Sequence, residues 1–114
     1  MTTNNHEVIF AIVNAGYAED AMHVAREEGA RGGTIINGRG VAREDEATFF
    51  GITIHADKEL LMIVVEKNIR DQVLHALYKR MGMQQKAQGI VFSLPVSDVA
   101  GLAAAPEETE DSEV

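Results

Sequence analysis

Leu60-Leu61-Met62-Ile63-Val64-Val65 is the stretch of sequence that decides the fold. This unbroken apolar run predicts the strongest β-strand of the chain. An antiparallel strand with one wet face alternates apolar and polar residues, whereas a run without polar residues is typical of a strand buried on both faces. A chain of 114 residues forms one domain with a modest core and cannot cover both faces of such a sheet. We therefore expect identical copies to pack sheet against sheet as a homo-oligomer.

The segments around this run alternate between strand and helix patterns. Strands are expected over residues 7–13, 34–37, 60–65 and 90–94. Amphipathic helices are expected over residues 18–28 and 69–81. Two β-α-β units in succession predict an α+β, ferredoxin-like βαββαβ fold, in which both helices cover one face of a four-stranded antiparallel sheet.

Turn and cap residues support these boundaries. Gly29 and Gly82 can end the two helices, because glycine tolerates the backbone conformation common at a helix C-terminus. Asn14 can cap the first helix, and Asn68 followed by Asp71 predicts a capping box at the start of the second.

The net charge of −8 is concentrated at the C-terminal end. The last eight residues hold five acidic side chains, which leaves about −3 for the rest of the chain. We expect residues 103–114 to form an acidic, disordered tail that follows a single domain over residues 1–102. The domain lacks the clustered Lys and Arg of proteins that bind duplex nucleic acid, so no nucleic-acid partner is expected.

Targeting signals and cysteines are also missing from the sequence. No basic and apolar leader opens it, and no apolar run approaches the ~20 residues of a membrane span. We expect a soluble, cytoplasmic protein without direct membrane insertion. Zero cysteines exclude a disulfide framework and thiolate metal sites.

A glycine-rich segment, Arg31-Gly32-Gly33-Thr34-Ile35-Ile36-Asn37-Gly38-Arg39-Gly40, brackets the second strand. Glycines let backbone N–H groups approach an anion closely, and concave clusters of amides at a strand end commonly hold phosphate. Alternatively, Gly32 and Gly33 only turn the chain, and Gly38 and Gly40 open a loop. Both interpretations stay open on glycine spacing alone.

Residues 41–51 predict a solvated, functional loop. A run of charged side chains precedes Phe49 and Phe50, a composition that suits an excursion into solvent. The alternation in residues 52–54 is typical of the strand that returns from such a loop.

Together these features resemble the PII signal-transduction family. The resemblance rests on the order of elements, on Asn37-Gly38-Arg39-Gly40 at a strand end, on the central strand, and on a glycine before Ile90-Val91-Phe92. It covers residues 6–102 and is nearest to the divergent PII-like branch. It implies a PII-like, ferredoxin-fold homotrimer that binds adenine nucleotides in the clefts between subunits. The loop after the second strand, called the T-loop in this family, would span about residues 38–51.

The resemblance also implies which residues bind the nucleotide: Gly38, Arg39, Gly40, Val64, Lys86, Gln88 and Gly89. The two T-loop glycines would lie against the phosphates, and Val64 would lie beside the adenine. Residues 82–89 match the phosphate-wrapping loop of the family, the B-loop, in which Lys86 is the nearby cation. Arg31 and Arg43 are further candidates for phosphate contacts.

Departures from the family pattern narrow the choice of expected ligands. The paired arginines beyond the last strand are replaced by Gly101 and Ala103, so ADP is expected as the preferred nucleotide, with ATP and AMP as alternatives. Ala42 stands where the family has a glutamine that helps hold metal and 2-oxoglutarate, and the T-loop contains no tyrosine. Neither 2-oxoglutarate sensing nor tyrosine modification is expected.

A partner protein is implied by the T-loop. The residues expected to contact it are Arg43, Glu44, Asp45, Glu46 and Phe49. Charged side chains would steer the encounter and the aromatic ring would anchor it. The partner would be the cytoplasmic subunit of a membrane transporter or a metabolic enzyme.

Three other function classes fit the sequence less well. The histidines could suggest a metal-binding trimer of related fold, but His6, His23, His55 and His75 share no ligand spacing, so no metal site is predicted. An amino-acid-binding effector module uses the same layout, although such modules usually accompany a second domain. No Ser-His or Cys-His constellation supports an enzyme, so the chain is not expected to be one.

Overall fold

The computed structural model describes residues 2–3, 5–41, 48–49, 52–53 and 57–101. In this part of the chain the elements are β1 Thr2–Thr3, β2 His6–Asn14, α1 Ala18–Glu27, β3 Thr34–Arg39, β4 Thr48–Phe49, β5 Ile52–Thr53, β6 Asp57–Glu66, α2 Lys67–Met81, β7 Ile90–Pro95 and β8 Asp98–Val99. The four strands and two helices expected from the sequence are all present, with their ends within three residues of the predicted positions.

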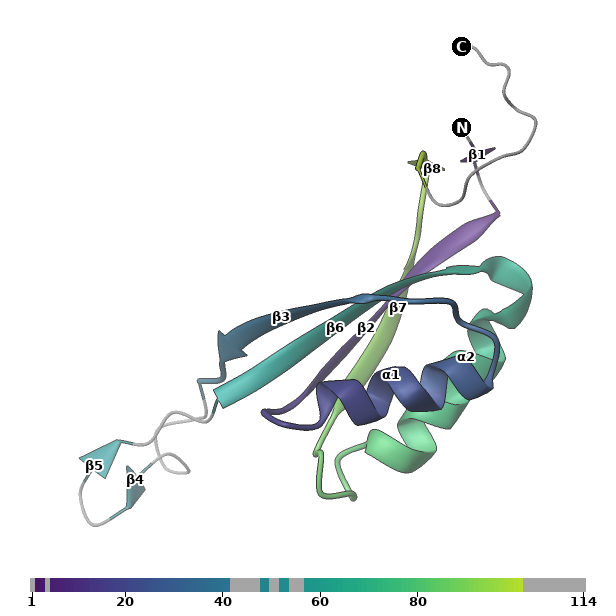
Figure 1. Ribbon diagram of the computed structural model, residues 1–114. Coiled ribbons are helices and arrows are strands. Elements are labelled where there is room, and N and C mark those ends of the chain that lie inside the picture. The colour runs from purple at the N-terminus through teal and green to yellow at the C-terminus, as the bar shows by residue number, and fades with distance from the viewer. Residues whose placement is uncertain (1, 4, 42–47, 50–51, 54–56, 102–114) are drawn as a thin grey trace.

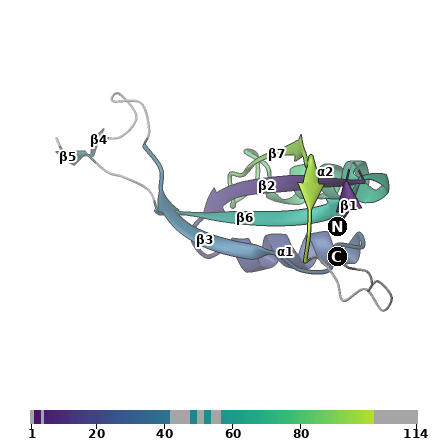
Figure 2. The same cartoon turned by 90° about the horizontal axis from the view of Figure 1, so that it is seen from above.

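Four strands form one antiparallel sheet in the order β3-β6-β2-β7. The central strands β2 and β6 pair along their whole length, from His6 opposite Glu66 to Asn14 opposite Lys58. Both helices lie on one face of this sheet (Figure 1 and Figure 2). The arrangement confirms the ferredoxin-like α+β fold. Neither helix in the described ranges has the length and apolar character of a membrane span.

The hydrophobic core lies between the helices and the face of the sheet that they cover. Along the two central strands every second side chain points into it: Ile9, Ala11, Val13, Leu61, Ile63 and Val65. The helices contribute Ala18, Ala21, Met22, Val24, Ala25, Val73, Leu77 and Met81. The core side chains, which recur every second residue in the strands and at helical spacing in α1 and α2, therefore pack in one layer.

The opposite face of the sheet, here called the open face, is also apolar. The register places ten apolar side chains on it: Val8, Phe10, Ile12, Ile36, Leu60, Met62, Val64, Ile90, Phe92 and Leu94. Those of the central strands are half-buried, whereas Ile90 is 55% and Phe92 39% exposed. Within one copy the apolar run of β6 is therefore covered on one side only, as the sequence predicts for an isolated chain.

The start of α1 differs from the prediction. Tyr17 occupies the position before the helix, and no side chain at that position caps it. Instead, the N–H of Ala18 donates to Oε1 of Glu59 on β6 over 2.9 Å. The prediction that Asn14 caps this helix is wrong, because its side chain bonds to Lys58 and to the segment after α2.

The capping box predicted for α2 is also wrong. The helix begins at Lys67, two residues earlier than expected, and Glu66 in the cap position makes no side-chain capping bond. Because Glu66 is still part of β6, the chain passes from strand to helix without a loop. Asn68 is already inside the first turn and cannot serve as its cap.

The end of α1 follows the prediction. Gly29 has a φ of +110°, a conformation that side chains with a Cβ rarely adopt. The N–H of Gly29 donates to the carbonyl of Arg26, and the N–H of Ala30 donates to that of Ala25. These two bonds form the Schellman motif that commonly closes a helix.

A partly buried ion pair attaches α2 to the sheet. Nη1 of Arg70 lies 3.0 Å from Oε1 of Glu7 on β2 and 3.0 Å from Oγ of Ser93 on β7. Glu7 is only 6% exposed, so its charge needs this partner. One guanidinium therefore connects the helix with two strands.

Two short ladders lie beyond the main sheet, at opposite ends of the molecule (Figure 1). β1 pairs with β8, and β4 pairs with β5. The second ladder confirms that the chain returns through residues 52–53 after the excursion that begins beyond β3. Ile54, the last residue of the predicted returning arm, lies outside the described residues.

Candidate ligand site at the end of the open face

The open face ends in four residues that we call the polar row: Gly38, Lys58, Asn14 and Gln88. Lys58 on β6 pairs with Gly38 on β3 and with Asn14 on β2. Gln88, just before β7, accepts a hydrogen bond from Asn14 at 3.4 Å. Because neighbouring strands lie about 4.8 Å apart, the row extends across the sheet for about 14 Å. One step inward the same four positions are apolar, so this end combines an apolar wall with a polar edge.

Asn14 is the centre of this row. Its Oδ1 accepts a hydrogen bond from Nζ of Lys58 over 2.7 Å, and its Nδ2 donates to the carbonyl of Lys86 over 3.1 Å and to Oε1 of Gln88. Its backbone N–H donates to the carbonyl of Ala87 over 2.8 Å. One residue therefore holds both a lysine at the start of β6 and the segment between α2 and β7.

That segment, residues 82–89, is a compact loop. The N–H of Gln85 donates to the carbonyl of Gly82, the N–H of Gln88 donates to that of Gln85, and the N–H of Gly89 donates to that of Met81. Gln88 has a φ of +49°, which is uncommon for a residue other than glycine. The loop is thus fixed by its own backbone and by Asn14.

Glycine occurs at positions 38 and 89 at this end for different structural reasons. A Cβ on Gly89 would lie 2.3 Å from the carbonyl oxygen of Met81, so glycine is required there by the packing of the chain itself. A Cβ on Gly38 would have no atom of the described part of the chain within 4 Å. Nothing among the described residues therefore requires glycine at position 38, whereas close approach of a ligand or a neighbouring copy would.

The structure brings six of the seven predicted nucleotide-binding residues to this end of the sheet. Gly38 and Arg39 are the last residues of β3, and Gly40 follows them. The other three, Lys86, Gln88 and Gly89, belong to the compact loop. The sequence placed Gly38 and Arg39 at the base of a loop, but both are still in the strand, because pairing with Lys58 and Asp57 continues to that point.

Val64 and Arg31 lie elsewhere. Val64 is on the open face, six residues along β6 from Lys58 and therefore about 20 Å from the polar row. Arg31 precedes β3, at the strand end opposite Gly38. The expectation that Arg31 contacts the same phosphates as Gly38 is not supported within one chain, because the length of β3 separates them.

The predicted partner-binding residues Arg43, Glu44, Asp45 and Glu46 lie outside the described residues, as do Ala42, the second aromatic Phe50 and the expected tail over residues 103–114. Phe49 belongs to β4. The roles expected for these residues stay predictions.

Sequence analysis missed the two central members of the row. The sequence pattern predicts a helix cap at Asn14 and no role for Lys58. Both are the polar residues that end an apolar central strand at the same side of the sheet. The predicted βαββαβ order places the start of β6 beside the end of β2, so the topology together with this polarity change could have found them.

The polar row is suited to binding an anion. The ammonium of Lys58 offers charge-assisted hydrogen bonds, and Arg39 and Lys86 are exposed cations nearby in the chain. The four residues of the row include no nucleophile with an adjacent base, so this arrangement offers binding rather than covalent chemistry.

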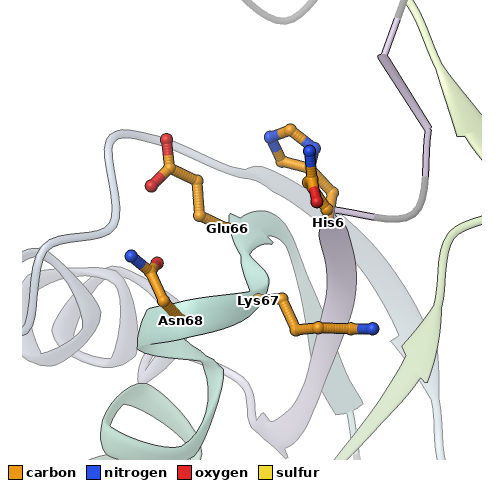
Figure 3. A pocket seen from close by; sticks show the side chains of 5 residues that line it. His6, Glu66, Lys67 and Asn68 are labelled. Atoms are coloured by element: carbon orange, nitrogen blue, oxygen red, sulfur yellow. The ribbon is translucent and has the colours of Figure 1, made fainter.

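A second candidate location is an open pocket of about 610 Å³ at the other end of β2 and β6 (Figure 3). It is lined by Asn5, His6, Glu66, Lys67 and Asn68. His6 and Glu66 are register partners, and Nδ1 of His6 has no hydrogen-bond partner among the residues that the structure describes. Two potential ligands do not make a metal site, and the described residues contain no group of three His, Cys, Asp or Glu placed to hold one.

Comparison with known proteins identifies the fold and the family. Among curated protein sequences, none matches this chain significantly. The crystal structure of Arabidopsis thaliana PII bound to citrate is similar, with a TM-score of 0.61 and 24% sequence identity over 87% of this chain and 82% of that one. At this identity the structural likeness shows the fold alone. The family model described as nitrogen regulatory protein P-II matches residues 6–104. The chain therefore belongs to the nitrogen regulatory protein P-II family.

Proposed function

We propose that this protein is a homotrimeric regulator that binds an adenine nucleotide between its subunits and signals the bound state to a partner protein. The observation that carries the proposal is the open face, an apolar sheet surface that ends in a polar row. Membership in a family of regulatory proteins supports a signalling role rather than an enzymatic one.

The open face supports assembly of identical copies. Its ten apolar side chains are half-buried or exposed in one chain, and each contributes about 1.5–3 kcal/mol when it passes from full exposure to burial. Packing the same surface of each copy around one axis removes this apolar area from water and leaves the helices outside. Soluble monomers rarely expose so continuous an apolar patch.

The distances within one chain favour a ligand site built from two copies. A purine needs apolar walls, which Val64 and its neighbours on the open face can supply, whereas phosphates need amides and cations, which the polar row can supply. Because these two groups of residues lie about 20 Å apart along β6, one compact nucleotide can contact both only if they come from different copies.

ADP is the proposed ligand, with ATP and AMP as alternatives. Among the described residues, Lys58, Arg39 and Lys86 are cations near the row, and Gly101 and Ala103 stand where the family has the arginines that reach a further phosphate. Calorimetry with AMP, ADP and ATP, each with and without Mg²⁺, tests this. Saturable binding that is tightest for ADP is expected, and a folded protein that binds none of the three would overturn the proposal.

The T-loop is the proposed contact with a partner, either the cytoplasmic subunit of a transporter or a metabolic enzyme. A ligand can shift the loop between two states only by its differential affinity for them, so nucleotides that differ in phosphate number must bind these states unequally. Deleting residues 43–48 should leave nucleotide affinity within about twofold of the parent value while removing partner capture. Loss of nucleotide binding in the deletion variant would contradict this division.

A further inference from the structure

The hydrogen bonds of Asn14 connect two segments that are far apart in sequence. Lys58 follows the excursion between β3 and β6, and residues 86–88 belong to the loop between α2 and β7. Asn14 bonds to Nζ of Lys58, to the carbonyls of Lys86 and Ala87, and to Oε1 of Gln88. The next residue adds a further link, because the N–H of Ala15 donates to the carbonyl of Asp57 over 3.1 Å.

We infer that Asn14 is a positioning residue of the ligand site, which holds Lys58 and the loop over residues 82–89 in one fixed relation to a bound anion. This role rests on the nucleotide site proposed above. Asn14 would act through Lys58 and the loop, without contributing a charge of its own.

The chemistry of the amide suits this role. An asparagine side chain is both acceptor and donor, so one residue can accept from an ammonium and donate to a carbonyl at the same time. A lysine side chain is long and flexible, and a bond of 2.7 Å to Oδ1 restricts its ammonium to the end of the open face. An anion that takes a hydrogen bond from Lys58 therefore meets a cation whose position is already set.

The same contacts couple the loop to Lys58. If an anion draws Nζ of Lys58 away from Asn14, Oδ1 of Asn14 loses the hydrogen bond that it accepts from this lysine. The bonds that Nδ2 of Asn14 donates to Lys86 and Gln88 are then free to rearrange. Gln88 already has an uncommon positive φ, and a change in its side-chain bond acts directly on that conformation. Ligand binding at Lys58 should thus change the conformation of the loop, and a change in the loop should alter ligand binding at Lys58.

A double-mutant cycle on the full chain tests this, with ADP as the probe. Calorimetry is run on the parent protein, on Asn14→Ala, on Lys58→Ala and on the double variant. Asn14→Ala is expected to weaken ADP binding about tenfold, and the double variant to bind no more weakly than Lys58→Ala alone, because the asparagine acts through the lysine. Gln72→Ala removes an amide side chain from α2, where it bonds to the carbonyl of Glu28, and this variant should bind as the parent does.

Hydrogen exchange provides a second measurement, and a merely structural role of Asn14 would not change its result. In the parent, saturating ADP should slow exchange both in residues 57–60 and in residues 86–89. In Asn14→Ala at saturating ADP, protection should remain in one segment and be lost in the other. Asn14→Ser, which keeps an acceptor oxygen in a smaller side chain, replaces the alanine variant if circular dichroism shows that the latter does not fold.

The possible failures are distinguishable. If the parent protein binds none of the adenine nucleotides, the proposed function fails and takes this role with it. If the parent binds ADP and Asn14→Ala binds equally well, or if the two single losses multiply in the double variant, only the role of Asn14 is overturned. Equal protection of both segments in the parent and in the variant would overturn it as well.

Discussion

Phe10 stacks on Phe92 across the pairing of β2 with β7, with ring centroids 5.3 Å apart and an angle of 27° between the rings. The two residues are direct register partners on the open face. Phe92 is 39% exposed, although a stacked aromatic pair of this kind is usually found in a core or an interface. The pair lies on the surface that we expect to be buried between copies.

The first prediction concerns assembly. Phe92→Glu places a charge on the open face, and burying an unpaired carboxylate is costly, so the variant should be a folded monomer at micromolar concentration. Sedimentation velocity measures this. Tyr78→Glu is the matched control, because Tyr78 is also an exposed aromatic but lies on α2, away from the open face, and this variant should assemble as the parent does. Equal assembly of both variants would contradict the proposed interface.

The second prediction concerns stability. Arg70→Ala leaves the carboxylate of Glu7 buried without its partner and should lower the free energy of unfolding by about 2–3 kcal/mol. Arg80→Ala removes an exposed pair with Glu27 and should cost less than about 1 kcal/mol. Urea denaturation at one fixed protein concentration compares them, since assembly makes stability depend on concentration. Similar losses in both variants would show that Glu7 does not depend on Arg70.

The third prediction concerns two glycines, of which one is required by chain packing and the other is proposed to face the ligand. Gly89→Ala should destabilise the fold, because the new methyl group would collide with the backbone of Met81. Gly38→Ala should unfold at the parent temperature but bind ADP more weakly, because its Cβ meets no atom of the described residues within 4 Å and would face the proposed ligand. Thermal unfolding and calorimetry are measured on both variants. Unchanged ADP affinity in Gly38→Ala would remove this position from the site.

The fourth prediction compares two arginines at opposite ends of β3. Arg39→Ala should lower ADP affinity tenfold or more, which corresponds to about 1.4 kcal/mol, because Arg39 adjoins the polar row. Arg31→Ala should weaken ADP binding less than Arg39→Ala does, because the length of β3 separates Arg31 from the row of its own chain. Calorimetry under one salt condition makes the comparison. A larger loss for Arg31→Ala than for Arg39→Ala would place the phosphates at the other end of the strand.

Sequence patterns predicted the fold because they reflect local physics. The apolar run of residues 60–65, the alternation around it and the glycines at the helix ends place two helices and four strands within three residues of their observed bounds. The capping residues were less predictable. Glu59 supplies the acceptor for the N–H of Ala18 although the two residues are 41 positions apart, and a bond between residues that far apart in sequence has no local signature.

The ligand site was predictable only in part. Gly38 and Gly89 could be found from composition and family resemblance, although the reason for Gly89 turned out to be close packing against Met81. Asn14 and Lys58 have no motif of their own, and the pairing of β2 with β6 is what brings them together. Polar residues are common at strand ends, so the role of such a residue depends on its hydrogen-bond partner. That partner is set by the tertiary structure.

The central claim is that copies of this chain cover one another's open faces and so create the seams in which a nucleotide binds. Sedimentation equilibrium at micromolar concentration tests it most directly. The account predicts a particle of about three times the 12.4 kDa chain mass, with or without ADP. A folded particle of 12.4 kDa under both conditions would contradict it.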